Sequence, residues 1–203
     1  MIFDKTPRLR LEVCTLAALG LLCGAAAAAS EVQGIPNFHQ VDARVYRGAH
    51  PTIQGIANLA KLGVKTVVDL RESGAETAAE EKAVKAAGMI YVSIPMNGGH
   101  APSHQQVAQV LRVLDSDSAT PVFVHCKRGA DRTGTVMACY RIVHDHWDNQ
   151  RALNEAKSDG MHWFELSMQR FVMNYSPRDY QTAIGAGNGQ SVTVAPHPGI
   201  DSH

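Results

Sequence analysis

The stretch VFVHCKRGADRTG, residues 122–134, changes its pattern part-way along and thereby predicts both a fold and a site. VFVH at 122–125 is a short apolar run, which is typical of a buried strand. A six-residue turn then leads from Cys126 to Arg132, where a helix is expected to begin and to continue to residue 144. Because the ligands of parallel α/β sheets bind at the carboxyl ends of the strands, this turn lies where a site is expected.

Similar apolar runs alternate with amphipathic stretches along the rest of the chain. We expect strands at 45–47, 64–70, 89–94 and 122–125, and helices at 53–62, 76–87, 103–114, 132–144, 149–158 and 163–175. Strands separated by helical stretches of this length predict right-handed crossovers. The expected fold class is therefore α/β, with three layers in which a mostly parallel central sheet is flanked by helices.

The two ends of the chain depart from this pattern. Three basic residues precede an uncharged, alanine-rich run of 17 residues at 13–29, and small residues at its end fit a signal-peptidase site. A membrane span needs about 20 strongly apolar residues, so we expect a cleaved signal peptide at 1–29 and a periplasmic or secreted protein; an uncleaved anchor is the alternative. The folded domain is expected at 30–180, and the segment 181–203 is expected to be a flexible tail.

Composition excludes several classes of protein. With 203 residues, of which 45% are hydrophobic, the chain can fill the core of one domain and is not a disordered segment. Its 19 basic and 19 acidic residues balance, so we expect no nucleic-acid partner. Cleavage at 29 would leave only Cys126 and Cys139, too few for a disulfide scaffold, and Cys139 is expected to be a core thiol. Stable membrane insertion is not expected, and the oligomeric state is not indicated.

The residue types in the turn suit the binding of a tetrahedral oxyanion. Backbone N–H groups of a tight loop at a helix N-terminus converge on one cup, and Gly129 permits backbone angles that a side chain would forbid. Arg132 offers a planar fork to two phosphate oxygens, and the same positive field favours the thiolate of Cys126. Thr133 is expected to donate its hydroxyl to the Cys126 sulfur, and His125 to brace the loop by hydrogen bonding.

These residues resemble the signature His-Cys-x-x-Gly-x-x-Arg-[Ser/Thr]-Gly of the cysteine-dependent protein tyrosine and dual-specificity phosphatases. Four further segments are similar to blocks of the compact dual-specificity group found in bacteria, which includes exported periplasmic enzymes: YRGAHPT (46–52), KTVVDLRES (65–73), IYVSIPM (90–96) and RIVHDHWDNQRAL (141–153). The resemblance covers residues 45–175. It implies that the domain at 30–180 is a phosphatase domain.

The resemblance also implies a mechanism. Cys126 is the nucleophile that forms a cysteinyl-phosphate, and Arg132 binds the transferring phosphoryl group. The phosphate-binding residues, here called the cradle, are Lys127, Arg128, Gly129, Ala130, Asp131 and Arg132. No metal and no cofactor is implied, because the cradle supplies the positive charge. The implied substrate is a protein phosphorylated on tyrosine, serine or threonine, or a small phosphomonoester.

Other functions remain open at this point. A phosphoinositide or inositol polyphosphate phosphatase is one alternative, since Lys127 and Arg128 add positive charge at the rim, although they are equally explained as solvated loop residues. A phosphate-binding module with little turnover is a second alternative. A rhodanese-type sulfurtransferase also carries a cysteine at a strand end, but its loop usually lacks the Arg-Thr-Gly that follows here.

One departure from the family pattern concerns the general acid. The family carries an Asp in the loop after the strand at 89–94, whereas the loop MNGGHAPS at 96–103 has no carboxylate. Three substitutes are available: Asp131 in the cradle, Asp69 at the end of the strand at 64–70, and His100 in the loop. Asp131 is favoured, because myotubularin-like and Sac-type phosphoinositide phosphatases carry an Asp within this loop. The alternative is that Asp131 is a helix N-cap whose carboxylate only bonds backbone amides.

Four residues outside the signature carry further expectations. Arg47 and Arg71 follow strands and are expected to form structural ion pairs. Trp147 and Trp163 are expected to pack in the core or in an interface between the last helices.

Overall fold

The computed structural model describes Met1 and residues 32–186. Residues 2–29 of the predicted signal peptide and residues 187–203 of the predicted tail lie outside the described residues. Within the described part of the chain, no helix combines the length and the apolar composition that crossing a bilayer requires.

Five strands of the described chain form one sheet in the order β1-β2-β5-β3-β4. Their bounds are β1 His39–Gln40, β2 Val45–Ala49, β3 Thr66–Asp69, β4 Ile90–Ser93 and β5 Val122–Cys126. β1 is antiparallel to β2, and every other neighbouring pair is parallel. The prediction of a mostly parallel sheet is therefore confirmed. Sequence reasoning missed β1, because a two-residue polar strand leaves no apolar run.

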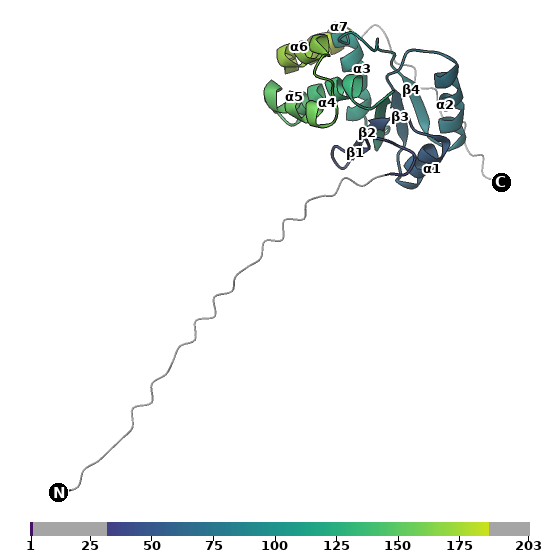
Figure 1. Ribbon diagram of the computed structural model, residues 1–203, viewed down its shortest axis with the longest axis horizontal. Helices are drawn as coiled ribbons and strands as arrows, with labels where there is room; N and C mark the ends of the chain where they lie inside the picture. Colours follow the sequence, from purple (N-terminus) through teal and green to yellow (C-terminus); the bar gives the residue numbers. More distant parts are fainter. Residues whose placement is uncertain (2–31, 187–203) are drawn as a thin grey trace.

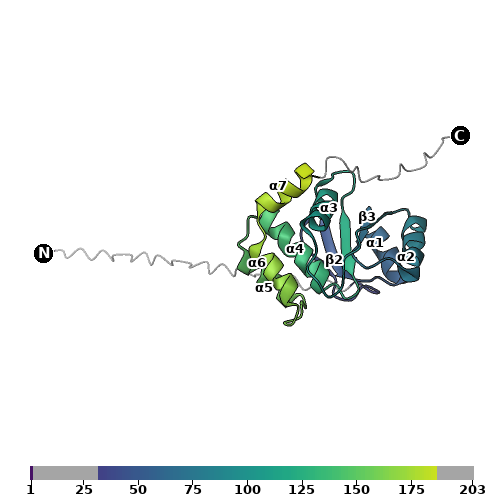
Figure 2. The ribbon, with the colours of Figure 1, turned by 90° about the horizontal axis from the view of Figure 1, so that it is seen from above.

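Helices cover both faces of this sheet and produce the expected three layers. Figures 1 and 2 show α1 and α2 on one face and α3 to α7 on the other. The bounds are α1 Ile53–Lys61, α2 Ala75–Ala86, α3 His104–Asp115, α4 Asp131–His144, α5 Asn149–Ser158, α6 Leu166–Asn174 and α7 Pro177–Ala186. Because successive strand residues point to opposite faces, Val67 and Phe123 pack towards α1 and α2, whereas Val68 and Val124 join the core beneath α3 and α4.

Two predicted boundaries near the end of the domain are corrected. The last predicted helix, 163–175, begins only at Leu166. A further helix, α7, extends to Ala186, so the start of the predicted tail at 181 is too early. Tyr180 and Ala183 of α7 are buried, which explains why this segment packs on the domain despite its weak sequence pattern.

The parallel strands end at one level and define where a site can form. In the strand register His125 lies beside Gly48 on one side and Asp69 on the other. The chain leaves β5 at Cys126, and α4 begins at Asp131. The cradle is therefore the short connection between the central strand and a 14-residue helix.

Candidate active site

Cys126 is the last residue of β5 and lies at the base of the cradle. It is only 2% exposed, and among the described residues it and Cys139 are both free thiols. The turn 127–130 leads from it to the first amides of α4, and the N-terminal end of a helix carries partial positive charge. Cys139 lies in α4 and is fully buried in the core, which confirms the expected core thiol, and burial raises the pKa of that thiol.

The backbone of the cradle requires glycine at position 129. Gly129 has φ +69°, in the region that side chains rarely adopt. A Cβ atom there would lie 2.3 Å from the carbonyl carbon of Gly48 and 2.5 Å from the nitrogen of Ala49. The cradle therefore packs against the end of β2 with no room for a side chain.

A buried arginine supports the cradle from outside. Nη2 of Arg47 donates to the carbonyl oxygen of Gly129 over 2.6 Å, and Nη1 donates to Oδ2 of Asp159 over 2.7 Å. Burial lowers the pKa of Arg47, and the charge of Asp159 opposes that effect. Arg47 thus forms the expected structural ion pair and fixes the turn.

Arg132 lies in the first turn of α4 and reaches across the ends of two strands. Its Nη1 donates to the carbonyl oxygen of Leu70, at 3.3 Å, and to that of Met96, at 3.2 Å. Together with Lys127 it lines a pocket of about 300 Å³. The guanidinium is therefore held at the mouth of the cradle, where a planar fork can bind phosphate oxygens.

His125 precedes the nucleophile in β5, Thr133 lies in the first turn of α4, and both are fully buried. Nδ1 of His125 lies 3.3 Å from the carbonyl oxygen of Cys126, as expected for a residue that braces the loop. The predicted hydrogen bond from Thr133 to the Cys126 sulfur is not formed, because the Thr133 hydroxyl has no hydrogen-bond partner among the described residues. This hydroxyl remains free to donate to a group that enters the cradle.

Asp131, the favoured acid, is engaged by other side chains. Its Oδ1 accepts hydrogen bonds from the backbone nitrogen of His162, at 2.9 Å, and from the ring Nδ1, at 3.1 Å; its Oδ2 accepts one from Arg128. Burial alone would raise the pKa of Asp131, but the hydrogen bonds from His162 and the charge of Arg128 outweigh burial and lower the pKa. The carboxylate bonds a backbone amide, as in the alternative interpretation, but that amide belongs to the 159–165 connection rather than to α4.

Asp69, the second candidate, is also held in its ionised form. Arg71 donates to both of its oxygens, and the hydroxyl of Tyr91 donates to Oδ2 over 2.8 Å. Burial raises the pKa of Asp69, yet the hydrogen bonds from Arg71 and the neighbouring His125 lower it further than burial raises it. Arg71 thus forms the expected structural ion pair. Neither candidate carboxylate is poised to give up a proton near neutral pH.

The loop after β4 contains the third candidate. His100 lies there with its Nδ1 2.8 Å from Oδ1 of Asn97. Sequence reasoning missed Glu72, which lines the same pocket as Arg132 and lies beside the loop, with Nδ2 of Asn97 3.5 Å from its Oε1. Its position could have indicated it, because Glu72 lies three residues beyond the end of β3, at the edge of the sheet where the parallel strands have their carboxyl ends.

One cluster has the residue types of a metal site. Oxygen and nitrogen atoms of Asp69, Glu80 and His125 lie within 4.8 Å of one another, and all three residues are buried. However, the guanidinium of Arg71 donates to both carboxylates. The place of a cation in this cluster is thus already taken by Arg71, and the donor set does not suit a metal.

An apolar surface begins next to the cradle. Trp163 is 82% exposed, which corrects the expectation that it packs in the core, and Phe164 and Leu166 are exposed as well. These three residues, here called the 163–166 patch, follow His162, which contacts Asp131 in the cradle. Trp147, in contrast, is partly buried, as expected, and packs beneath the guanidinium groups of two arginines.

A comparison with protein families shows which family the chain belongs to. The family model PTP-NADK, described as DSP-PTPase phosphatase fused to NAD+ kinase, matches residues 28–174. The chain belongs to this family. The family match includes the strand, cradle and helix that carry Cys126 and Arg132.

Individual relatives agree with this assignment. The chain is 35% identical over 125 residues to the dual specificity protein phosphatase TpbA of Pseudomonas aeruginosa; the match covers 61% of this chain and 55% of that protein. It is 27% identical to the inositol diphosphatase DSP5 of Arabidopsis thaliana, covering 69% and 70% of the two chains. A crystal structure of a P. aeruginosa TpbA variant in complex with pTyr superposes with a TM-score of 0.65 and 29% identity, covering 81% of this chain and 99% of that one. The chain thus spans about half the length of the full TpbA protein.

Proposed function

We propose that the protein is a phosphomonoester hydrolase that works through a cysteinyl-phosphate on Cys126. The observation that carries this proposal is the buried Cys126 at the end of the central strand, below the amino end of α4 and the anchored Arg132. The sulfur attacks phosphorus, the phosphorus–oxygen ester bond breaks, and the leaving oxygen takes a proton. Water then attacks the phosphorus and returns a proton to the group that protonated the leaving oxygen; the sulfur–phosphorus bond breaks, and phosphate leaves with Cys126 restored as the thiolate. The cradle amides and Arg132 stabilise the charge on the phosphoryl oxygens throughout.

The proton for the leaving oxygen comes, in this proposal, from Glu72. Asp69 and Asp131 are held as carboxylates by their partners, which makes them poor acids. Glu72 lies on the wall of the pocket that Arg132 also lines. His100 is the alternative donor, because it belongs to the loop whose Met96 carbonyl accepts from Arg132.

The substrate that we propose is a phosphoprotein. The 163–166 patch supports this choice, because apolar and aromatic surface beside a phosphate site favours peptide side chains over the polar ring of an inositol phosphate. Arg128, which sequence reasoning considered as an attractor of polyanions, contacts Asp131 and His162. The TpbA variant crystallised with pTyr is consistent with the same class.

A substrate panel tests this proposal. We expect the protein to hydrolyse phosphotyrosine peptides faster than inositol polyphosphates. Trp163→Ala should lower kcat/KM for the peptides by about tenfold, as loss of an aromatic contact predicts, and leave p-nitrophenyl phosphate nearly unchanged. Leu62→Ala, at another exposed apolar residue, on the opposite face of the sheet, is the matched control.

The panel also distinguishes the alternatives. Faster hydrolysis of inositol polyphosphates would replace the phosphoprotein assignment with the inositol phosphate one. Tight binding of phosphopeptides with no hydrolysis of any substrate would instead indicate a phosphate-binding module.

We also propose that the protein is exported to the periplasm or secreted. The three basic residues before the apolar run, and the small residues at 25–30, support this assignment. The N-terminal mass of the protein recovered from the producing cell tests it: a mature chain that begins near residue 30 agrees, and an intact Met1 in the cytoplasm contradicts it.

A further inference from the structure

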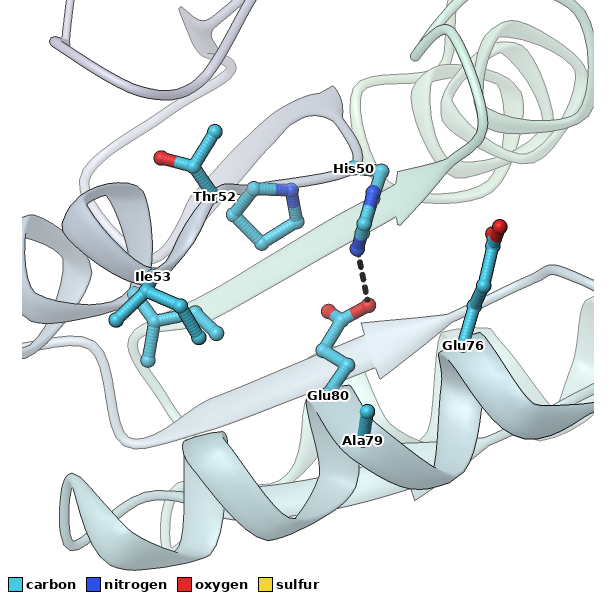
Figure 3. A pocket seen from close by; sticks show the side chains of 8 residues that line it. His50, Thr52, Ile53, Glu76, Ala79 and Glu80 are labelled. Atoms are coloured by element: carbon cyan, nitrogen blue, oxygen red, sulfur yellow. Dashed lines mark ion pairs between the residues drawn. The ribbon is translucent and has the colours of Figure 1, made fainter.

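A buried glutamate connects α2 to the residue that precedes the nucleophile. The side chain of Glu80 is 2% exposed, and its Oε1 lies 2.9 Å from Nε2 of His125. Its Oε2 accepts from Arg71 and lies 3.2 Å from Nε2 of His50. Figure 3 shows His50 and Glu80 pointing towards one another across a second pocket, of about 390 Å³. Nothing in the proposed chemistry uses this carboxylate.

Both nitrogens of the His125 ring lie close to oxygen atoms, although only Nδ1 forms a hydrogen bond. Nδ1 faces the carbonyl oxygen of Cys126, and Nε2 faces the Glu80 carboxylate. Both of these partners can only accept, whereas a neutral imidazole has one N–H and one lone pair. The Nε2 contact is an ion pair rather than an aligned hydrogen bond, so charge governs it. Only the imidazolium form suits both neighbours.

The charges around His125 also favour its imidazolium form. Asp69 and Glu80 each carry a negative charge, and Arg71 supplies one positive charge to both of them. His50 adds no charge near neutral pH, because burial and the neighbouring Arg71 lower its pKa. Burial and the hydrogen bond to Asp69 raise the pKa of Tyr91, so its hydroxyl is neutral.

The balance therefore leaves one negative charge for His125 to compensate. Uncompensated charge is strongly disfavoured in a buried cluster. Glu76, which lines both pockets, does not alter this count, because its side chain is 88% exposed to water and lies 3.9 Å from Arg71.

We propose that Glu80 is a positioning residue: it holds His125 as an imidazolium behind the cradle and thereby favours the thiolate of Cys126. The imidazole and the sulfur lie on opposite faces of β5, because successive strand residues alternate. The charge of His125 therefore reaches the nucleophile through the backbone of Cys126, whose carbonyl oxygen lies 3.3 Å from Nδ1. The role of Glu80 in catalysis rests on the proposed function. The charge state of His125 and the reactivity of the thiol do not depend on turnover.

The first test uses the unaltered protein and needs no substrate. Nitrogen-15 NMR spectra of the imidazole rings, with His125 assigned by the signal that His125→Gln removes, report which ring nitrogens carry hydrogen. We expect both nitrogens of His125 to be protonated at neutral pH. A neutral tautomer of His125 in the folded protein would overturn the proposal.

The second test measures how fast iodoacetamide alkylates Cys126 as a function of pH, with the modified peptide followed by mass spectrometry. Glu80→Gln keeps the shape of the side chain and removes its charge. It should slow alkylation near pH 6 by about tenfold, which corresponds to a shift of the profile by about one pH unit. His50→Gln, which alters the other neighbour of Glu80, is the matched control and should change the rate less than twofold.

A double variant separates this role from a general loss of structure. In a His125→Gln background, Glu80→Gln should have no further effect on alkylation, since it acts through His125. An equal slowing in that background, or an unchanged profile in the folded Glu80→Gln protein, contradicts the proposal. If the unaltered protein has no phosphatase activity but shows a protonated His125 and the expected response of alkylation to Glu80→Gln, the proposed function is wrong and the role of Glu80 stands.

Discussion

At the scale of single residues, the partners of a carboxylate decide what it can do. Asp131 has the position in the sequence that favours a general acid, but hydrogen bonds from His162 and the charge of Arg128 hold it ionised. Asp69 is held in the same way by Arg71. These partners turn both carboxylates into structural anchors of the site and leave proton transfer to a group on the pocket wall.

Substitution of the proposed acid should change the dependence on the leaving group. Glu72→Gln should slow hydrolysis of phenyl phosphate, whose leaving oxygen needs a proton, by about 10²-fold. Hydrolysis of p-nitrophenyl phosphate should fall much less, because its leaving group is stable as an anion. The basic limb of the pH–rate profile should also disappear, since that limb reports loss of the acid's proton.

Two further variants make this measurement specific. Glu76→Gln alters another exposed carboxylate on the same pocket wall and should leave the leaving-group dependence unchanged. If His100→Gln steepens that dependence and Glu72→Gln does not, the acid is His100 and the assignment of Glu72 is wrong.

The sequence allowed the prediction of Cys126 and Arg132 because a local pattern places them. The strand, the turn and the start of the helix lie within 13 consecutive residues, 122–134. The partners of Asp131 and His125 could not be predicted in this way. His162 is 31 residues from Asp131, and Glu80 lies on a different helix from the cradle. Only the packing of these elements brings the groups together.

At the scale of elements, the cradle depends on the close packing of the β5–α4 turn against the end of β2. The positive φ of Gly129 and the short approach of its hydrogen to Gly48 both require glycine. Gly129→Ala should therefore destabilise the protein by about 2–4 kcal/mol and lower kcat/KM by about 10²-fold, because the cradle amides lose their alignment. Urea unfolding and steady-state kinetics measure the two effects.

Gly63→Ala is the matched control for this variant. Gly63 also has a positive φ, of +80°, but a Cβ atom there would meet no atom within 4 Å. Gly63→Ala should therefore lower the free energy of unfolding by about 1 kcal/mol and leave kcat/KM unchanged. Equal effects of the two substitutions would show that close packing does not maintain the cradle.

Most elements could be predicted from the sequence because their patterns are strong. Buried strands such as β3 and β5 are nearly continuous apolar runs, and the side chains of Thr52 and Ser103 cap the first turns of α1 and α3. α7 was missed because its buried residues are few, and tertiary contacts with α3 stabilise it: Tyr180 donates to Asp115, and Arg112 donates to the carbonyl of Ile184. The local sequence pattern is a weak predictor of a helix that tertiary contacts stabilise.

At the scale of the whole molecule, the buried carboxylates make stability depend on pH. The pKa values of Asp69 and Asp131 lie below the ordinary value of 3.8 in the folded protein. Their contribution to stability is therefore fully present above about pH 4 and is lost as the pH falls through the lower folded values. We expect the free energy of unfolding to decline steeply below pH 4.

Asp131→Asn isolates one part of this dependence. The variant should be less stable than the unaltered protein by about 1–3 kcal/mol at pH 7. The difference should shrink as the pH falls below 3.8, because the aspartate is then protonated first in the unfolded chain and, at lower pH, in the folded protein. Urea unfolding at several pH values measures it. A difference that stays constant down to pH 2 would show that the charge of Asp131 does not stabilise the fold.

The central claim is that Cys126 accepts the phosphoryl group of a monoester, and trapping the intermediate tests it most directly. A phosphotyrosine peptide that carries the radiolabel in its phosphoryl group is mixed with the protein, and acid stops the reaction within the first turnover. The protein is then digested, and the labelled fragment is identified by mass spectrometry. We expect label on the fragment that contains Cys126, and none after Cys126→Ser. Release of phosphate without labelled Cys126, or undiminished hydrolysis by Cys126→Ser, would contradict it.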